Sequence, residues 1–221
     1  MQIKAIIFDI GGVLAYDVWE HLFLDSESGL VKVYQLNQER VRLVGQELWN
    51  KFAYNISLDE NDWRELEKKY WDQFIDRIPI KTSLNDFIQL TNRFIRPVEG
   101  MIPLLEFLQS QGFDLAICSN NTDFWLRRQM EQLDLDRFFT PNKIVISTRI
   151  GVPKSSPEFE MFDAVIHALG KDKTQCILVD DRAENIEQAV KYGLAAILFP
   201  SHSKYGHLYL SALLRTMTDF R

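Results

Sequence analysis

The sequence predicts an α/β fold in which a doubly wound parallel sheet is interrupted by an inserted all-helical segment. Two observations predict this class. After residue 96, short apolar runs alternate with amphipathic helical segments, which is typical of a parallel sheet with helices on both faces. Residues 15–95 instead show helical periodicity without a clear strand signal, and this stretch is too long for a single connection between strands.

The first strand is predicted within residues 3–8, where "IKAIIF" ends in a continuous apolar run. Such a run is typical of a strand that is covered on both faces. In the insertion, residues 37–52 place apolar side chains at helical spacing. Residues 57–75 begin with Ser57 and Glu60, the pattern of a capping box, and predict a second helix.

The remaining elements are predicted to alternate along the chain. Strands are expected over residues 114–119, 143–147, 176–181 and 195–199, and helices over residues 100–113, 123–133, 156–170 and 182–193. Three of the predicted helical segments end near a glycine, as helices often do: Gly112, Gly170 and Gly193. We therefore assign residues 1–14 and 96–221 to a Rossmann-like core and residues 15–95 to the insertion.

Composition and charge exclude several classes of protein. The chain has 221 residues and a net charge of -6, which argues against a nucleic-acid partner. Its two cysteines, Cys118 and Cys176, lie in separate predicted strands, and we expect both to be reduced thiols. No apolar run approaches the roughly 20 residues that span a bilayer, and the N-terminus does not resemble a signal peptide. We expect a cytoplasmic protein without a membrane partner, as a monomer or weak dimer.

Polar residues follow three of the predicted strands at the point where each strand ends. They are Asp9 after "IIF", Ser119 and Asn120 after "AIC", and Asp180 and Asp181 after "ILV". In an open parallel sheet the carboxyl ends of the strands line one edge, and ligands bind there. We therefore expect these residues, which are far apart in the sequence, to meet in one crevice.

Three carboxylates at this edge predict a metal ion. Like charges at such short range would otherwise raise one another's pKa values. A hard divalent cation with oxygen ligands resolves the repulsion. We expect Mg²⁺, which in turn indicates a phosphoryl substrate. Lys154 in "GVPKSSPE" precedes a predicted helix and would supply a point charge for phosphate and for Asp9.

Four segments together resemble the haloacid dehalogenase-like hydrolase superfamily. "FDIGGVL" resembles its first motif, "ICSNN" its second, Lys154 its third, and "LVDDRAENIEQAVKYGLAAILF" its fourth. The resemblance covers nearly the whole chain, and the helical insertion resembles the superfamily's helical cap. It implies that Asp9 is a nucleophile that forms an aspartyl-phosphate, which water then cleaves.

The resemblance also implies roles for the other residues of the four segments. Lys154 is assigned to catalysis beside Asp9, and phosphate binding is assigned to Ser119, Asn120, Gly12 and Lys154. The Mg²⁺ site is assigned to Asp9, the backbone carbonyl of Gly11, Asp180 and Asp181.

The sequence departs from this pattern at Gly11, where phosphatases of the superfamily usually carry a second aspartate as general acid and base. Some members that resemble sugar-phosphate phosphatases also carry glycine there. We therefore predict a Mg²⁺-dependent phosphatase acting on a small phosphorylated metabolite, with a sugar phosphate as one candidate. Tyr16 and Asp17 are near enough in sequence to replace the missing acid.

Two alternatives stay open from the sequence. A metal-independent 2-haloacid dehalogenase needs no acid at position 11, because halide leaves unaided. A catalytically impaired relative used for binding or regulation is the other. The tryptophans at helical positions (Trp19, Trp49, Trp63 and Trp71) are read as core residues, and Phe124 and Trp125 follow the second polar locus, where they could face the insertion.

Overall fold

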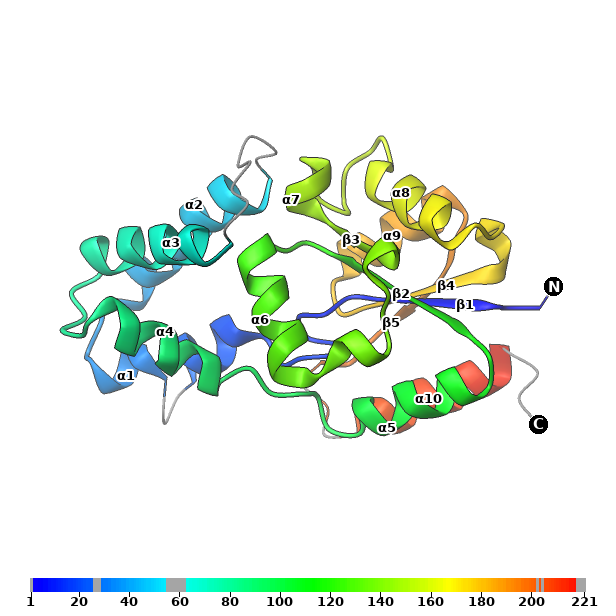
Figure 1. Ribbon diagram of the computed structural model, residues 1–221, viewed down its shortest axis with the longest axis horizontal. Coiled ribbons are helices and arrows are strands. Elements are labelled where there is room, and N and C mark those ends of the chain that lie inside the picture. Colours follow the sequence, from blue (N-terminus) through cyan, green and yellow to red (C-terminus); the bar gives the residue numbers. More distant parts are fainter. Residues whose placement is uncertain (1, 26–28, 55–62, 202, 204, 218–221) are drawn as a thin grey trace.

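The computed structural model describes residues 2–25, 29–54, 63–201, 203 and 205–217. Its centre is a sheet of five parallel strands: β1 (Ala5–Phe8), β2 (Asp114–Ser119), β3 (Ile144–Ile146), β4 (Cys176–Asp180) and β5 (Ala195–Leu198). Their order is β3-β2-β1-β4-β5. The chain runs outward from β1 in both directions, so the sheet is doubly wound, and the predicted fold class is confirmed (Figure 1).

Strand β1 lies at the middle of the sheet and is buried on both faces. Ile6 and Phe8 belong to one apolar cluster, while Ala5 and Ile7 belong to a second cluster on the opposite face. All four side chains are fully buried. The continuous apolar run in the sequence therefore reflects a strand that packs against helices on both sides.

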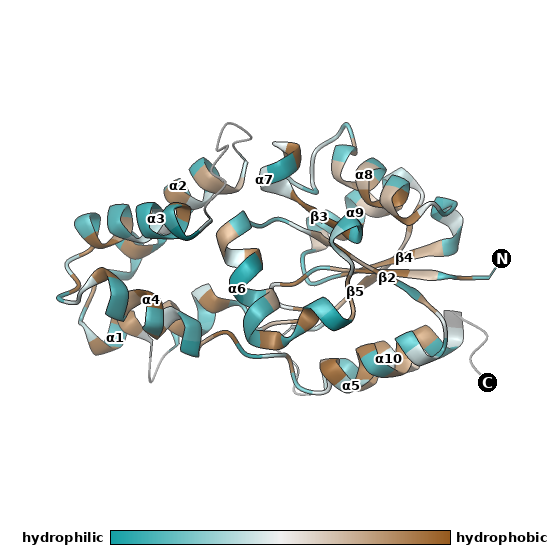
Figure 2. Cartoon of the chain, viewed as in Figure 1, coloured by the Kyte–Doolittle hydropathy of each residue, from teal (hydrophilic) through white to brown (hydrophobic). Residues whose placement is uncertain are grey.

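Helices cover both faces of this sheet. The cluster of Ala5 and Ile7 includes residues of α8 (Glu160–Leu169) and α9 (Ala183–Tyr192). The cluster of Ile6 and Phe8 includes residues of α5 (Met101–Ser110), α6 (Asp123–Leu133) and α10 (Gly206–Met217). Hydrophobic and hydrophilic residues alternate along these helices, as expected for amphipathic helices that pack on a sheet (Figure 2).

The described part of residues 15–95 is helical. It contains a π-helix (Trp19–Leu24), α1 (Leu30–Val33), α2 (Gln38–Ala53), α3 (Trp63–Arg77) and α4 (Leu84–Arg93). The chain enters and leaves this segment side by side, because the Tyr16 N–H donates to the Arg96 carbonyl and the Val98 N–H to the Leu14 carbonyl. The division at residues 14 and 96 stays a prediction, and Ser57 and Glu60 of the predicted capping box lie outside the described residues.

Several predicted boundaries are wrong. The helix predicted from residue 156 begins at Glu160, because Phe159 has a left-handed backbone with φ of 62°. Ser147, predicted as the end of a strand, opens the short helix α7 (Ser147–Ile150). Helix α10 was not predicted. None of the described helices has the length and apolar character needed to cross a membrane.

Candidate active site

Asp9 lies at the carboxyl end of the central strand. Its N–H donates to the Val179 carbonyl at 2.9 Å, which extends the pairing of β1 with β4 by one residue. One carboxylate oxygen, Oδ1, accepts a hydrogen bond from the Ile10 N–H at 2.7 Å. The side chain is only 7% exposed. The strand edge therefore holds this carboxylate in a fixed direction.

Lys154 is fully buried and lies between two carboxylates. Its Nζ is 3.0 Å from Asp9 Oδ2 and also donates a hydrogen bond to Asp180 Oδ2. The Lys154 N–H donates to Asn120 Oδ1 at 2.8 Å, so Asn120 positions the loop that carries the lysine. Asn120 itself follows β2. The structure thus brings residues from β1, β2, β4 and the Lys154 loop together at one edge.

Asp180 uses both carboxylate oxygens within the protein. Oδ1 accepts hydrogen bonds from the Arg182 N–H at 2.9 Å and from Asn185 Nδ2 at 3.0 Å, while Oδ2 accepts from Lys154. The side chain is fully buried. This arrangement favours a role in orienting Lys154, and the assignment of Asp180 to a metal site stays a prediction.

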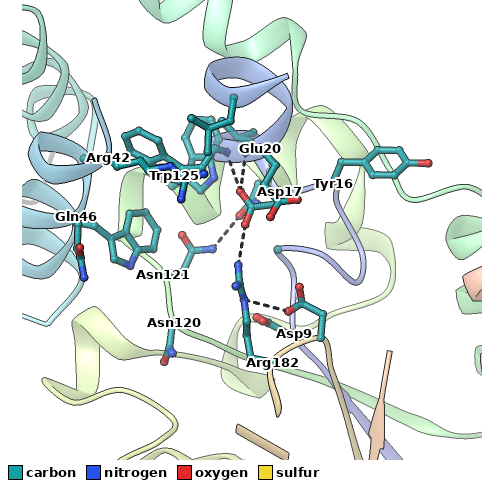
Figure 3. A pocket seen from close by; sticks show the side chains of 18 of the residues that line it. Asp9, Tyr16, Asp17, Glu20, Arg42, Gln46, Asn120, Asn121, Trp125 and Arg182 are labelled. Carbon is teal, nitrogen blue, oxygen red and sulfur yellow. Dashed lines mark hydrogen bonds and ion pairs between the residues drawn. The ribbon is translucent and has the colours of Figure 1, made fainter. Parts of the chain in front are cut away.

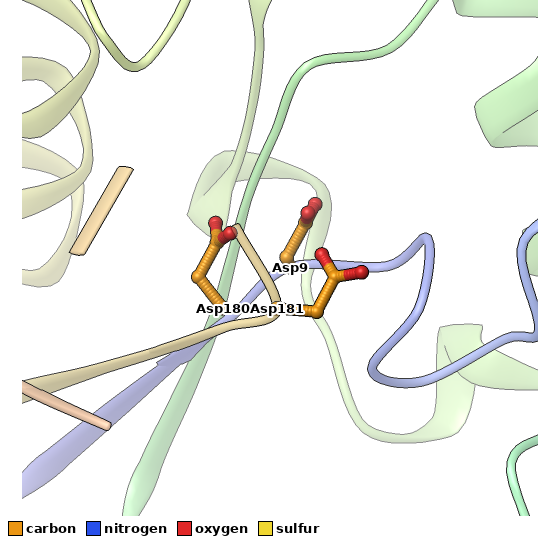
Figure 4. Close-up of side chains that lie close together, drawn as sticks. All are labelled: Asp9, Asp180 and Asp181. Carbon is orange, nitrogen blue, oxygen red and sulfur yellow. The ribbon is translucent and has the colours of Figure 1, made fainter. Parts of the chain in front are cut away.

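Asp181 completes a group of three carboxylates (Figure 4). Oxygen atoms of Asp9, Asp180 and Asp181 lie within 4.8 Å of one another. Asp181 Oδ1 is buried and accepts no hydrogen bond from any described residue, and its distance to Arg182 Nε is 3.8 Å. A buried carboxylate oxygen without a hydrogen bond is costly unless a cation approaches it.

The two glycines after Asp9 differ in their surroundings. A Cβ atom at Gly12 would lie 2.2 Å from Asp181 Oδ2, and Gly12 has φ of 77°, so a side chain there would displace the carboxylate. A Cβ atom at Gly11 would meet nothing within 4 Å. Gly12 therefore lets the backbone approach Asp181, whereas Gly11 leaves an open space beside Asp9.

The electrostatics of this group indicate an excess of negative charge. Burial raises the pKa of Asp9, against the opposing effect of Lys154. Burial, together with the Asp9 charge, raises the pKa of Asp181 to about 7. Burial alone would lower the pKa of Lys154, but Asp180 and Asp9 outweigh it and the net pKa is raised, so Lys154 stays charged. Lys154 is the cation at hydrogen-bond distance from this group, and the Arg182 guanidinium, 3.8 Å from Asp181, is shared with Asp17. The three carboxylates therefore carry an excess of negative charge that a divalent cation would offset.

The donor atoms also fit Mg²⁺, because carboxylate oxygens are the ligands that this ion takes in proteins. Asp9 and Asp181 face the shared space, and Gly11 lines it. Ser119, at the end of β2, is 2% exposed, and its hydrogen bond to Asp9 lowers the pKa of that carboxylate.

A family model described as haloacid dehalogenase-like hydrolase matches residues 3–193. The chain belongs to this family of hydrolases. The resemblance carried by the four sequence segments is therefore confirmed at the level of the family, and the protein is an enzyme. The roles of its individual residues stay predictions.

Individual relatives of this hydrolase differ in what their names describe. A sesquiterpene phosphatase of Aspergillus oryzae is 26% identical over 196 residues, which cover 88% of each chain. A family enzyme of Bacteroides thetaiotaomicron, solved with magnesium and inorganic phosphate, is 19% identical with a TM-score of 0.60, covering 94% of this chain and 99% of that one. A crystal structure of a dehalogenase has a TM-score of 0.63 at 17% identity, covering 97% and 96%. The two solved structures show the fold alone.

A cavity of about 510 Å³ opens in front of the hydrolase's carboxylates. Asp9, Gly11, Asn120 and Asp181 line it, while Ser119, Lys154 and Asp180 are buried and absent from its lining. The cavity extends to the helices of the insertion, where Arg42 and Gln46 of α2 face it (Figure 3). It has the size of a small-molecule site.

Sequence reasoning missed one ionic contact at this cavity. Asp17 Oδ2 lies 3.2 Å from Arg182 Nη2, and Asp17 Oδ1 accepts from the Trp19 N–H at 2.8 Å. The pair joins the start of the insertion to the loop after β4. Arg182 was recognisable only as the neighbour of Asp181, because nothing local in the sequence indicates a partner 165 positions away.

Proposed function

We propose that this hydrolase is a Mg²⁺-dependent phosphatase that acts on a small phosphorylated metabolite through an aspartyl-phosphate on Asp9. The observation that carries the proposal is the buried group of three carboxylates, whose charge Lys154 and the more distant Arg182 offset only in part, so that a divalent cation suits it. The phosphatase name of the Aspergillus oryzae relative, and the magnesium and phosphate in the Bacteroides thetaiotaomicron enzyme, support the same reaction class.

In this proposal a carboxylate oxygen of Asp9 attacks phosphorus. The bond between phosphorus and the leaving-group oxygen breaks, and the electron pair stays on that oxygen. Water then cleaves the acyl phosphate, releases inorganic phosphate and restores Asp9. Bound Mg²⁺ would neutralise charge on the phosphate oxygens. Lys154 holds Asp9 from the buried side and adds a fixed positive charge, and Asp180 keeps that lysine in place.

The proposed phosphate site lies between Asp9, Ser119 and Asn120, with Lys154 beneath them. Asn120 presents its carboxamide to the Lys154 loop and also lines the cavity. The Mg²⁺ ligands are proposed to be Asp9, Asp181 and the Gly11 carbonyl.

A dehalogenase remains the competing activity. It would use the same nucleophile without a metal, so the uncompensated charge beside Asp9 counts against it. A catalytically impaired relative would retain the fold without turnover, but the joint presence of Asp9, Lys154 and Asp181 in one group counts against that reading.

The test is a comparison of two reactions with purified protein. Phosphate release from p-nitrophenyl phosphate is measured with Mg²⁺ and with a chelator, and halide release is measured from a 2-haloacid. Mg²⁺-dependent phosphate release that Asp9→Asn abolishes supports the proposal, because an amide cannot form the acyl phosphate. Halide release that is indifferent to the chelator contradicts it, as does full phosphatase activity of a folded Asp9→Asn variant.

A further inference from the structure

The wall of the cavity is aromatic to a degree that the composition does not explain. Eight of its 24 lining residues are aromatic, whereas aromatic residues make up 12% of the chain. Four of the five tryptophans line it. The set includes Trp19, Trp49 and Tyr54 of the insertion and Trp125 of α6. Trp71 is buried in the core, as the sequence predicts, and Trp125 is buried as well. Trp19 and Trp49 pack against that core but are only partly buried, and they also line the cavity.

Trp19 is held rigidly in this wall. Its ring stacks on Phe23 with centroids 4.4 Å apart and meets the edge of Phe74 at 5.9 Å. The indole lies directly against the backbone of α2, because a Cβ atom at Gly45 would be 2.3 Å from Trp19 Cη2. A flat, preformed surface of this kind suits the face of another planar group.

The rest of the aromatic wall is fixed between the insertion and the core. Trp71 of α3 meets Trp125 of α6 edge-on at 6.2 Å. The buried Glu67 of α3 accepts hydrogen bonds from Arg128 of α6, with Arg128 Nη2 at 2.7 Å from Oε2 and Nε at 3.0 Å from Oε1. These contacts hold the wall at a set position relative to Asp9.

Several polar side chains that line the cavity form hydrogen bonds or ion pairs within the protein. Asn121 Nδ2 donates to Gln129 Oε1 at 2.8 Å, and Asp17 pairs with Arg182. Asn120 and Asn185 bond to the Lys154 loop and to Asp180. A substrate rich in hydroxyl groups needs free donors and acceptors around it, and on these residues part of that capacity is already used, whereas Arg42 and Gln46 of α2 also line the cavity.

Resting on the proposed phosphatase activity, we propose that the natural substrate is an aryl phosphate, the phosphate monoester of a phenol, whose ring lies against the tryptophan-lined wall. A second observation leads to the same class. Gly11 supplies no proton donor beside Asp9, and a phenolate leaves without one far more readily than an alkoxide does. The wall and the missing acid thus select the same leaving group for different physical reasons.

Five phosphorylated compounds separate the two reasons: phenyl, benzyl and cyclohexylmethyl phosphate, glucose 1-phosphate, and the acyl phosphate acetyl phosphate. Ring recognition predicts KM values for phenyl and benzyl phosphate about tenfold below those for the other three. Leaving-group chemistry predicts a higher kcat for phenyl than for benzyl phosphate. Equal KM values for benzyl and cyclohexylmethyl phosphate, or a preference for glucose 1-phosphate, overturn the aromatic assignment while leaving the phosphatase activity in place.

Variants at the tryptophans test the wall itself. Trp49→Leu should lower the kcat/KM ratio of phenyl over acetyl phosphate by about three- to tenfold, and Trp49→Phe should restore most of it. Trp63→Leu is the matched control, because Trp63 is the tryptophan outside the cavity lining, and it should leave the ratio unchanged. An unchanged ratio in Trp49→Leu overturns the inference.

A binding measurement keeps this inference separable from turnover. In the Asp9→Asn variant, phenyl phosphate should quench tryptophan fluorescence and bind more tightly than inorganic phosphate, because four tryptophans line the cavity. Equal affinities for the two overturn the aromatic assignment. If phenyl phosphate binds but none of the five compounds is hydrolysed with Mg²⁺, the phosphatase proposal is wrong, and the substrate inference that rests on it is wrong as well.

Discussion

Ionisation of Asp181 should destabilise the metal-free protein. Burial and the neighbouring Asp9 raise its pKa from 3.8 to about 7. As pH rises from 4 to 7 the unfolded chain releases this proton first, so the unfolded state binds fewer protons and stability falls. Each pKa unit corresponds to about 1.4 kcal/mol. Between pH 5 and pH 8 the ionisation should therefore cost about 3 kcal/mol.

The variant Asp181→Asn isolates this cost, because asparagine has nearly the same shape and stays neutral. We would measure urea unfolding of the metal-free wild type and variant at pH 5 and pH 8. The variant's advantage in free energy of unfolding should grow by about 3 kcal/mol between the two pH values. Mg²⁺ at 100 times its Kd should restore a similar amount, about 3 kcal/mol, to the wild type alone.

Asp172→Asn provides the control at an exposed position. Thr174 lowers the pKa of Asp172 through hydrogen bonds. Removing that carboxylate should therefore give no advantage that increases with pH. The reasoning about Asp181 is refuted if its variant shows the same stability difference at both pH values, or if Mg²⁺ stabilises the variant as much as the wild type.

Three further predictions concern Lys154 and the two glycines after Asp9. Lys154→Met leaves the Asp9 and Asp180 carboxylates buried without their cation, so the free energy of unfolding in urea at pH 7.5 should fall by about 3–5 kcal/mol. A fall of less than about 1 kcal/mol would contradict the buried ion pairs of Lys154. Gly12→Ala should lower the free energy of unfolding by more than about 1 kcal/mol and weaken Mg²⁺ binding measured by calorimetry. Gly11→Ala should change the free energy of unfolding by about 1 kcal/mol or less, because a Cβ atom there meets nothing. Similar effects of the two substitutions would contradict the difference in room for a side chain at these positions. Hydrolysis rates of monoesters with different leaving-group pKa values should depend steeply on that pKa in the wild type. The dependence should be weaker in Gly11→Asp, because the structure has room for the new side chain beside Asp9. A flat dependence in the wild type would mean that another group donates the proton.

The fold could be predicted from the sequence because β1, β2 and β4 are covered on both faces. Continuous apolar runs then mark each strand, and the alternation with helices determines the doubly wound sheet. The predicted ends of helices and strands were wrong where the backbone departs from regular helical or extended geometry. The left-handed Phe159 delays α8 to Glu160, although the sequence before it is compatible with a helix.

The carboxylate group could also be predicted, because parallel strand ends meet at one edge whatever lies between them in the chain. Lys154 was placed there by its loop and by the family resemblance. The aromatic wall was predictable only in part: Phe124 and Trp125, which follow the second polar locus, could be expected to face the insertion, and both line the cavity. Helical spacing shows that Trp19 faces inward, but not that it lies against the bare backbone of Gly45 at the edge of a cavity. That depends on how the insertion packs on the core, which local pattern does not encode.

Trapping the phosphorylated enzyme tests the central claim most directly. The protein is mixed with phenyl phosphate and Mg²⁺, quenched in acid within the first turnovers, digested, and analysed by mass spectrometry. The account predicts one added phosphoryl group on the peptide that contains Asp9, and its loss in the Asp9→Asn variant. Steady phosphate release by the wild type with the phosphoryl group on another residue, or undiminished release by Asp9→Asn, would contradict it.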